Sequence, residues 1–145
     1  IENVGVTNVS ITSTSTSNGK YYTGVVAYLG EQGVLKNIYS TGTVINNAAY
    51  YSYAGGLVGC SVGLIENSYS TCSVVAKSSS LFAYAGGLVG YLEGTINDCY
   101  ATGNVTANGA NNTYSRNGGL VGDKTKNSVV NNCYRTDTQK LIKYN

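Results

Sequence analysis

The chain has 145 residues, of which 11% are charged, and its formal net charge is +2. A charge this small, without a run of basic residues, argues against nucleic acid as a partner. No apolar stretch approaches the roughly 20 residues of a membrane-spanning helix, so membrane insertion is not expected. The absence of histidine excludes Ser-His-Asp and Cys-His catalytic sites, and also His-based metal sites.

Two phrases recur along the chain in the same order. The first begins at residues 1, 35, 65, 96 and 130 and reads "IENVGVT", "LKNIYST", "IENSYST", "INDCYAT" and "VNNCYRT". The second ends at residues 28, 60, 91 and 123 and reads "YYTGVVAY", "YAGGLVGC", "YAGGLVGY" and "RNGGLVGD". A common period of about 31–34 residues is typical of solenoids, propellers and arrays. Turn-forming residues lie at 17–19, 46–47, 78–80 and 108–112, where the unit length also varies.

The units are expected to be strands and turns, because glycine occurs throughout and the apolar residues do not recur at helical spacing. Aligning the units produces two apolar columns that we expect inside: Ile1, Leu35, Ile65, Ile96 and Val130, and then Val25, Leu57, Leu88 and Leu120. We therefore predict an all-β fold, a parallel β-solenoid of about four to five coils, forming one domain over residues 1–145. The general rule for parallel crossovers makes it right-handed.

The repeated glycine pairs are expected to form a corner before a short buried strand. Glycine allows both positive φ and close approach of backbones. The predicted corner residues are Gly55, Gly56, Gly86, Gly87, Gly118 and Gly119.

A polar column lies beside the first apolar column. Its members are Asn3, Asn37, Asn67, Asp98 and Asn132. Parallel coils are about 4.8 Å apart, and amides at that spacing hydrogen-bond along a stack. We predict a buried ladder at a turn. The adjacent column of Glu2, Lys36 and Glu66 alternates in sign, which suits in-register stacking.

Residues 85–105, "AGGLVGYLEGTINDCYATGNV", resemble a GLUG-motif repeat, whose core is Gly-Leu-any-Gly. Such repeats are similar to those of bacterial surface proteins, adhesin-like proteins and non-catalytic regions of some IgA peptidases. The resemblance implies a parallel β-solenoid and a location outside the cell or at its surface. It supplies no active site to transfer.

Outward columns supply the candidate binding surface. We expect the column of Thr7, Thr41, Thr71, Thr102 and Thr136 to face solvent, with a second column of Thr43, Ser73, Asn104 and Thr138 two places later. Tyrosine ladders are expected at Tyr39/Tyr69/Tyr100/Tyr134, at Tyr21/Tyr53/Tyr84 and at Tyr51/Phe82/Tyr114. These rows either stabilise the sheet surface or bind a glycan, and the threonine array raises a further hypothesis of ice binding.

Catalytic and metal sites are not expected. The seven acidic residues form no converging constellation, although Glu66 and Asp98 could approach each other across coils. No C-x-x-C motif is present, so zinc is not expected, and neither is any cofactor. Cys99 and Cys133 share one column, and two readings stay open: a disulfide between coils, or two small buried thiols.

The predicted function is a structural or adhesive repeat segment of a secreted or cell-surface protein, with surface or matrix components, including glycans, as partners. The alternatives are a glycan- or ice-binding face and a filament subunit that self-associates through the solenoid ends. The phrase "IENVGV" provides no N-terminal cap, whereas "RTDTQKLIKYN" partly blocks the C-terminal edge. The first coil is therefore expected either to continue upstream of Ile1 or to pair with another subunit.

Overall fold

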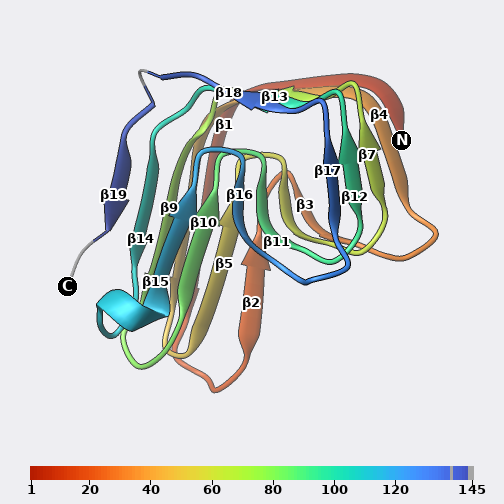
Figure 1. The fold of residues 1–145 in the computed structure, drawn as a ribbon. Coiled ribbons are helices and arrows are strands. Elements are labelled where there is room, and N and C mark those ends of the chain that lie inside the picture. Colours follow the sequence, from red (N-terminus) through yellow and green to blue (C-terminus); the bar gives the residue numbers. More distant parts are fainter. Residues whose placement is uncertain (138, 144–145) are drawn as a thin grey trace.

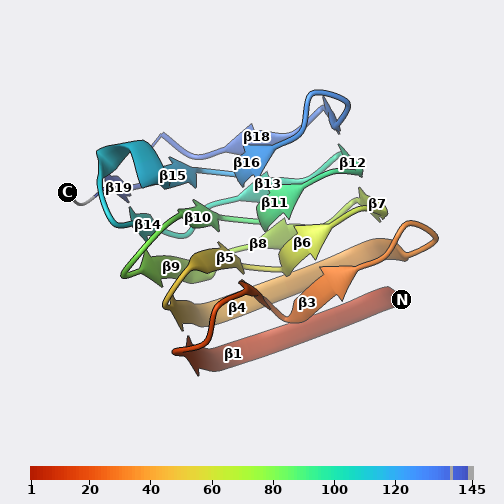
Figure 2. The same cartoon turned by 90° about the horizontal axis from the view of Figure 1, so that it is seen from below.

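The computed structural model describes residues 1–137 and 139–143, so Thr138 of the second threonine column lies outside the described residues. The fold is all-β and confirms the predicted solenoid, with about four turns. Every strand pairing is parallel, and one short 3-10 turn, η1 (Asn112–Tyr114), interrupts the pattern in the described part. Figure 2 shows the turns stacked in chain order, from β1 at one end to β18 at the other.

The largest sheet contains the two longest strands, β1 (Glu2–Ser15) and β4 (Val34–Ala48), which pair along their length. In later turns the same path is divided into three short strands. They are β7 (Leu64–Glu66), β8 (Tyr69–Ser70) and β9 (Ser73–Ser78), then β12 (Thr95–Asn97), β13 (Tyr100–Ala101) and β14 (Val105–Asn108), then β17 (Val129–Asn131), β18 (Tyr134–Arg135) and β19 (Leu141–Lys143).

Two further sheets complete each turn, and each has four strands. One consists of β2 (Lys20–Thr23), β5 (Tyr51–Gly55), β10 (Ala83–Gly86) and β15 (Ser115–Gly118). The other consists of β3 (Val26–Leu29), β6 (Val58–Ser61), β11 (Val89–Leu92) and β16 (Val121–Lys124). These two sheets meet at the glycine pairs and then diverge (Figure 1).

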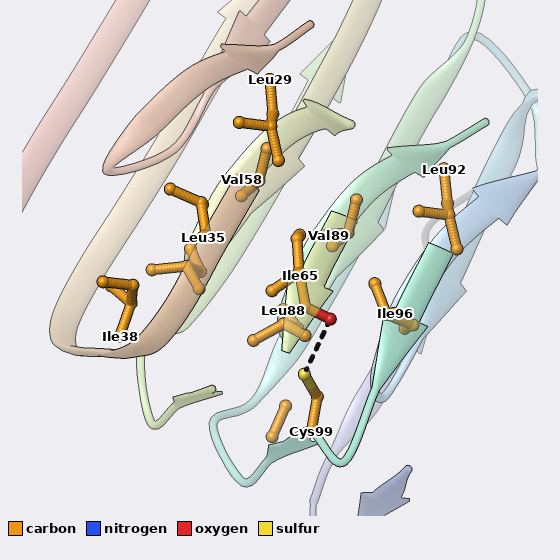
Figure 3. Close-up of a cluster of buried hydrophobic side chains, with 12 residues drawn as sticks. Leu29, Leu35, Ile38, Val58, Ile65, Leu88, Val89, Leu92, Ile96 and Cys99 are labelled. Atoms are coloured by element: carbon orange, nitrogen blue, oxygen red, sulfur yellow. Dashed lines mark hydrogen bonds between the residues drawn. The ribbon is translucent and has the colours of Figure 1, made fainter. Parts of the chain in front are cut away.

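The register places the predicted apolar columns inside. Leu35, Ile65 and Ile96 pair in sequence and are completely buried. Leu88 is also completely buried, among the side chains drawn in Figure 3. The column ends differ, because an end coil has a neighbour on one side: Ile1 is 68% exposed.

The core has two parts with different side chains. Leucine, isoleucine and valine fill the part enclosed by β6, β7, β11 and β12 (Figure 3). Alanine and valine fill the part between β9, β14 and the strands β5 and β10. Alanine is smaller than leucine and isoleucine, which allows β9 and β14 to pack closely against β5 and β10.

One predicted alignment is wrong. The first unit is one residue shorter at its corner, since Thr23 pairs with Ala54 but Val26 pairs with Val58. Tyr22, and not Tyr21, therefore continues the column of Tyr53. Residues 21 and 22 are both tyrosines, so the sequence alone does not show which of them continues the column. The shorter corner of the first unit places Tyr22 in the column of Tyr53.

Candidate functional site

The glycine corner brings two sheet backbones together. A Cβ atom at Gly86 would collide with the carbonyl oxygen of Val89, and one at Gly90 would lie 2.9 Å from the backbone nitrogen of Ala54. Of the two properties that glycine allows, the corner uses the close approach and not positive φ. Among the described glycines, positive φ occurs at Gly42, with a value of 128°. The same crowding, without positive φ, applies at the predicted corner positions Gly55, Gly56, Gly87, Gly118 and Gly119.

Beyond the corner, tyrosine rings fill the angle between the diverging sheets. We call this set the tyrosine angle: Tyr22, Tyr53 and Tyr84 on one wall, Tyr28 and Tyr91 on the other. Rings from opposite walls meet, with centroids 5.8 Å apart for Tyr22 and Tyr28, and 5.6 Å apart for Tyr53 and Tyr91. Tyr53 is 5% exposed although it lies outside the apolar core, because other rings cover it.

Burial shifts the pKa of two groups at the tyrosine angle. It raises the pKa of Tyr22 to about 12 and that of the neighbouring Cys60 thiol to about 11. A thiol with so high a pKa is a poor nucleophile near neutral pH.

An ion pair closes the tyrosine angle at the last turn. Arg116 follows Tyr84 in one column, and Asp123 follows Tyr91 in the other. The Nη1 atom of Arg116 lies 2.7 Å from Oδ2 of Asp123, and the guanidinium carbon is 5.6 Å from the ring centroid of Tyr84. The pair repeats the contact between walls that tyrosines make in the earlier turns.

The predicted binding columns lie on the opposite side of the fold, on β4, β8 and β13. The rings of Tyr39 and Tyr69 stack with centroids 5.2 Å apart, and those of Tyr69 and Tyr100 with centroids 4.7 Å apart, at angles of 7° and 5°. The ring faces therefore cover each other. What this outer tyrosine row (Tyr39, Tyr69, Tyr100) offers to solvent is a line of ring edges and hydroxyls.

The threonine column faces outward, as the alternation predicts. Thr71 is exposed, and Thr41 and Thr102 are half-buried. In the first coil the register shifts between Val6 and Val9, so the column is irregular there. Thr43, Ser73 and Asn104 are exposed as well. Their different side chains interrupt the flat array of paired threonines on which the ice-binding hypothesis depended.

The asparagine column is not buried, which corrects the prediction. Asn3, Asn37, Asn67, Asp98 and Asn132 are exposed and have φ values of 47–58°. The chain turns there through the left-handed region, which asparagine and aspartate tolerate better than other side chains. Asparagine and aspartate at every position of the column are the sequence signal for a left-handed turn, and the prediction of a buried ladder did not use it. Side-chain bonds join Asn37 to Asn3, at 2.8 Å, and Asn132 to Asp98.

The side chains considered for catalysis take part in these ladders. The Nδ2 atom of Asn97 donates to Oε1 of Glu66 at 3.5 Å, and Asp98 accepts from Asn132. Cys99 and Cys133 are free thiols, and each donates to a carbonyl oxygen two residues earlier at 3.0 Å. Within the described residues there is no pocket and no group of three metal-ligating side chains. The described helical structure includes no segment suited to crossing a membrane.

Comparison with known proteins gives two results. Residues 83–106 match the family model described as the GLUG motif. The fold is similar to the crystal structure of a protein from Bacteroides ovatus described as a "putative immunoglobulin A1 protease", with a TM-score of 0.73 and 24% identity. The similarity covers 97% of this chain and 53% of that protein, so the chain spans about half of its length. No curated protein matches the chain.

The matched segment runs from β10 through the glycine corner and β11 to β14, which is nearly one full turn of the solenoid. Its glycine corner and its leucine recur in the turns on both sides, where asparagine takes the left-handed position of Asp98. Residues 83–106 match the GLUG motif, as the resemblance in the sequence predicted.

Proposed function

We propose that the chain is a structural and adhesive repeat module of a protein located outside the cell or at its surface, without catalytic activity of its own. The observation that carries this proposal is the pairing of outward side chains along the solenoid axis. Tyr69 stacks between two tyrosines, and Glu66 and Asp98 accept amide hydrogen bonds from the next turn. Such side chains hold successive turns in register, which is the task of a repeat module.

The GLUG motif and the low content of charged residues support the proposed location. The similarity to the Bacteroides ovatus protein concerns the fold. The activity named in the description of that protein can nevertheless be tested on this chain. Immunoglobulin A1 incubated with the purified chain should remain intact when examined by mass spectrometry. Cleavage that disappears in Glu66→Gln or Asp98→Asn would overturn the non-catalytic part of the proposal.

A second candidate, glycan binding, is favoured by the hydroxyls of the outer tyrosine row. Tyr100 is 41% exposed, and the ring of Tyr69 is covered on both faces, so we expect a glycan to bind by hydrogen bonds to hydroxyls at the ring edges. A glycan array probed with the wild-type chain and with Tyr69→Phe and Tyr100→Phe tests this, because phenylalanine keeps the stack and removes the hydroxyl. Tyr53→Phe, in the covered tyrosine angle, is the matched control.

Binding that weakens in the two outer variants and persists in Tyr53→Phe would support glycan recognition by this row. Equal binding by all four proteins would assign recognition to another face. The complete absence of glycan binding leaves protein components of the surface or matrix as the partners of the adhesive role.

A further inference from the structure

The tyrosine angle contains ring contacts between its two walls as well as along each wall. Tyr91 belongs to one wall, where its neighbours in the adjacent turns are Cys60 and Asp123. Tyr53 and Tyr84 are neighbours on the other wall. The ring centroid of Tyr91 lies 5.6 Å from that of Tyr53 and 6.0 Å from that of Tyr84. Three phenols thus meet in the middle turns of the solenoid, and the proposed function uses none of them.

The inclination of the rings distinguishes these contacts from those of the outer tyrosine row. The rings of Tyr53 and Tyr91 come from different sheets and are inclined to each other by 40°. The rings of Tyr69 and Tyr100 come from neighbouring strands of one sheet and are inclined by 5°, so their faces meet. Tyr84 and Tyr91, at 25°, are also stacked. Of these three contacts, the one between Tyr53 and Tyr91 is the most suited to a meeting of ring edges.

Oxidative coupling of two tyrosines has a geometric requirement that opposite walls satisfy. The new carbon–carbon bond joins the ring carbons next to the two hydroxyl groups, so the coupled rings spread apart toward their Cβ atoms. Neighbouring strands of one sheet are only about 4.8 Å apart, which keeps the rings side by side. Tyr53 and Tyr91 instead start from walls that diverge beyond the glycine corner (Figure 1), and their rings meet between these walls.

The partial exposure of Tyr91 gives an oxidant a point of entry. Tyr91 is half-buried, whereas Tyr53 is 5% exposed. A one-electron oxidant removes an electron and a proton from the hydroxyl group of Tyr91 and leaves a phenoxyl radical. That radical recovers an electron and a proton from Tyr53, with which it is in contact. A second oxidation of Tyr91 then places two phenoxyl radicals side by side.

We propose that Tyr53 and Tyr91 form an oxidative cross-linking site, at which hydrogen peroxide, acting through a heme peroxidase, couples the two phenols into dityrosine. Each hydroxyl group loses its hydrogen atom, and these two atoms reduce one hydrogen peroxide to two water molecules. The two radicals join through their ortho carbons, and the hydrogen atoms on those carbons move to the oxygens, which restores both phenols. The cross-link ties β5 to β11, and therefore joins both walls and two successive turns. This inference is independent of the proposed function.

Peptide mapping of the oxidised chain tests the proposal. The dilute 145-residue chain is treated with a heme peroxidase and hydrogen peroxide, and the fraction with the mass of one chain is isolated. This fraction should be lighter than the untreated chain by the mass of two hydrogen atoms. Cleavage after lysine, arginine and glutamate releases residues 37–66, which contain Tyr53, and residues 78–93, which contain Tyr91. These two peptides should be recovered joined, with the fluorescence of dityrosine.

The same digest contains an internal control. Tyr69 and Tyr100 are released in the separate peptides 67–77 and 94–116, which should remain unjoined because their stacked rings do not present ortho carbons to each other. The chain unfolded in urea should lose the preference and join several pairs of peptides. Peptides 67–77 and 94–116 joined in the folded chain, or hydrogen loss confined to residues 78–93, would overturn the assignment to Tyr53 and Tyr91.

Three phenylalanine variants complete the test. Tyr53→Phe and Tyr91→Phe each keep a ring and remove the phenol, so either change should abolish the joined peptide. Tyr69→Phe is the matched control and should leave its yield unchanged. Urea midpoints close to that of the wild type show that each variant is folded. A joined peptide that persists in Tyr53→Phe or Tyr91→Phe would overturn the proposal. So would an unaltered wild-type chain under conditions that couple free N-acetyltyrosine.

Discussion

At the scale of single residues, the repeated asparagines and glycines have different tasks. Asn67 and its equivalents set the direction of the chain, because they adopt the left-handed conformation at an exposed turn. Gly86 and its equivalents provide space, because a side chain there would collide with the next strand. Both residue types mark turns in a sequence, and the backbone conformation distinguishes their roles.

The left-handed turn predicts the effect of substitutions at Asn67. Asn67→Val should lower the free energy of unfolding by about 1–2 kcal/mol, because a β-branched side chain clashes with the backbone there. Asn67→Gly should change it by less than about 0.5 kcal/mol. Urea denaturation measures both. Asn18→Val, in an exposed bend without positive φ, is the control, and an equal loss at both positions would contradict the conformational explanation.

Burial of the leucine column predicts a second set of stabilities. Leu88→Ala should cost about 2–5 kcal/mol of unfolding free energy, since the side chain is completely buried and leaves a cavity. Leu120→Ala should cost less, because Leu120 belongs to the last turn and is half-buried. Guanidinium denaturation compares the two, and a change below about 0.5 kcal/mol at Leu88 would contradict the register.

At the scale of elements, most strands after β4 are short, and many of their side chains contact the equivalent side chains of adjacent turns. Tyr69 lies between Tyr39 and Tyr100 in the outer tyrosine row, with nearly parallel rings. Such stacking contributes to the stability of the interface between two turns, and contributes less to the stability of either turn alone. A nearest-neighbour description, with one interface term per pair of turns, is appropriate for this fold.

Coupling between stacked tyrosines tests that description. A double-mutant cycle with Tyr69→Ala and Tyr100→Ala should give a coupling of about 0.5–1.5 kcal/mol. The cycle for Tyr39 and Tyr100, which are two turns apart, should give a coupling near zero. Thermal or urea unfolding provides the four free energies of each cycle. Similar couplings in the two cycles would show that the row does not act through contacts between adjacent rings.

At the scale of the whole molecule, acidic groups are buried in both the core and the tyrosine angle. Burial raises the pKa of the Cys99 thiol to about 12, and it raises that of Tyr22 to a similar value. Cys60, which stands between Tyr28 and Tyr91 on one wall, has a pKa raised to about 11. The folded chain therefore retains protons that the unfolded chain loses, and its stability depends on pH in the alkaline range.

The sign of this dependence is a prediction. The stabilisation is fully present below the ordinary thiol pKa of about 9 and is lost as the pH rises through about 12. The urea midpoint should fall steadily between about pH 8 and about pH 11. Cys99→Ala should reduce the slope, because one proton-retaining group is removed. A midpoint independent of pH over this range would contradict the burial of these groups.

The repeat by itself determined the period, the parallel stacking and the identity of the core columns. Residues such as Leu35, Ile65 and Ile96 recur at nearly constant spacing, and identical positions in successive turns must lie above one another for an apolar column to be continuous. The outward orientation of Thr71 followed in the same way from the two-residue alternation of a strand.

Tertiary structure decided what depends on the angle between sheets and on the ends of the stack. The selection of Tyr22 over Tyr21, the burial of Tyr53 by rings from the other wall, and the exposure of Asn67 all follow from how sharply the chain bends at its corners. The position of Gln139 over the last corner depends on a segment that leaves the repeat. A repeating pattern specifies contacts between equivalent residues of adjacent turns, whereas contacts between different faces depend on the three-dimensional path of the chain.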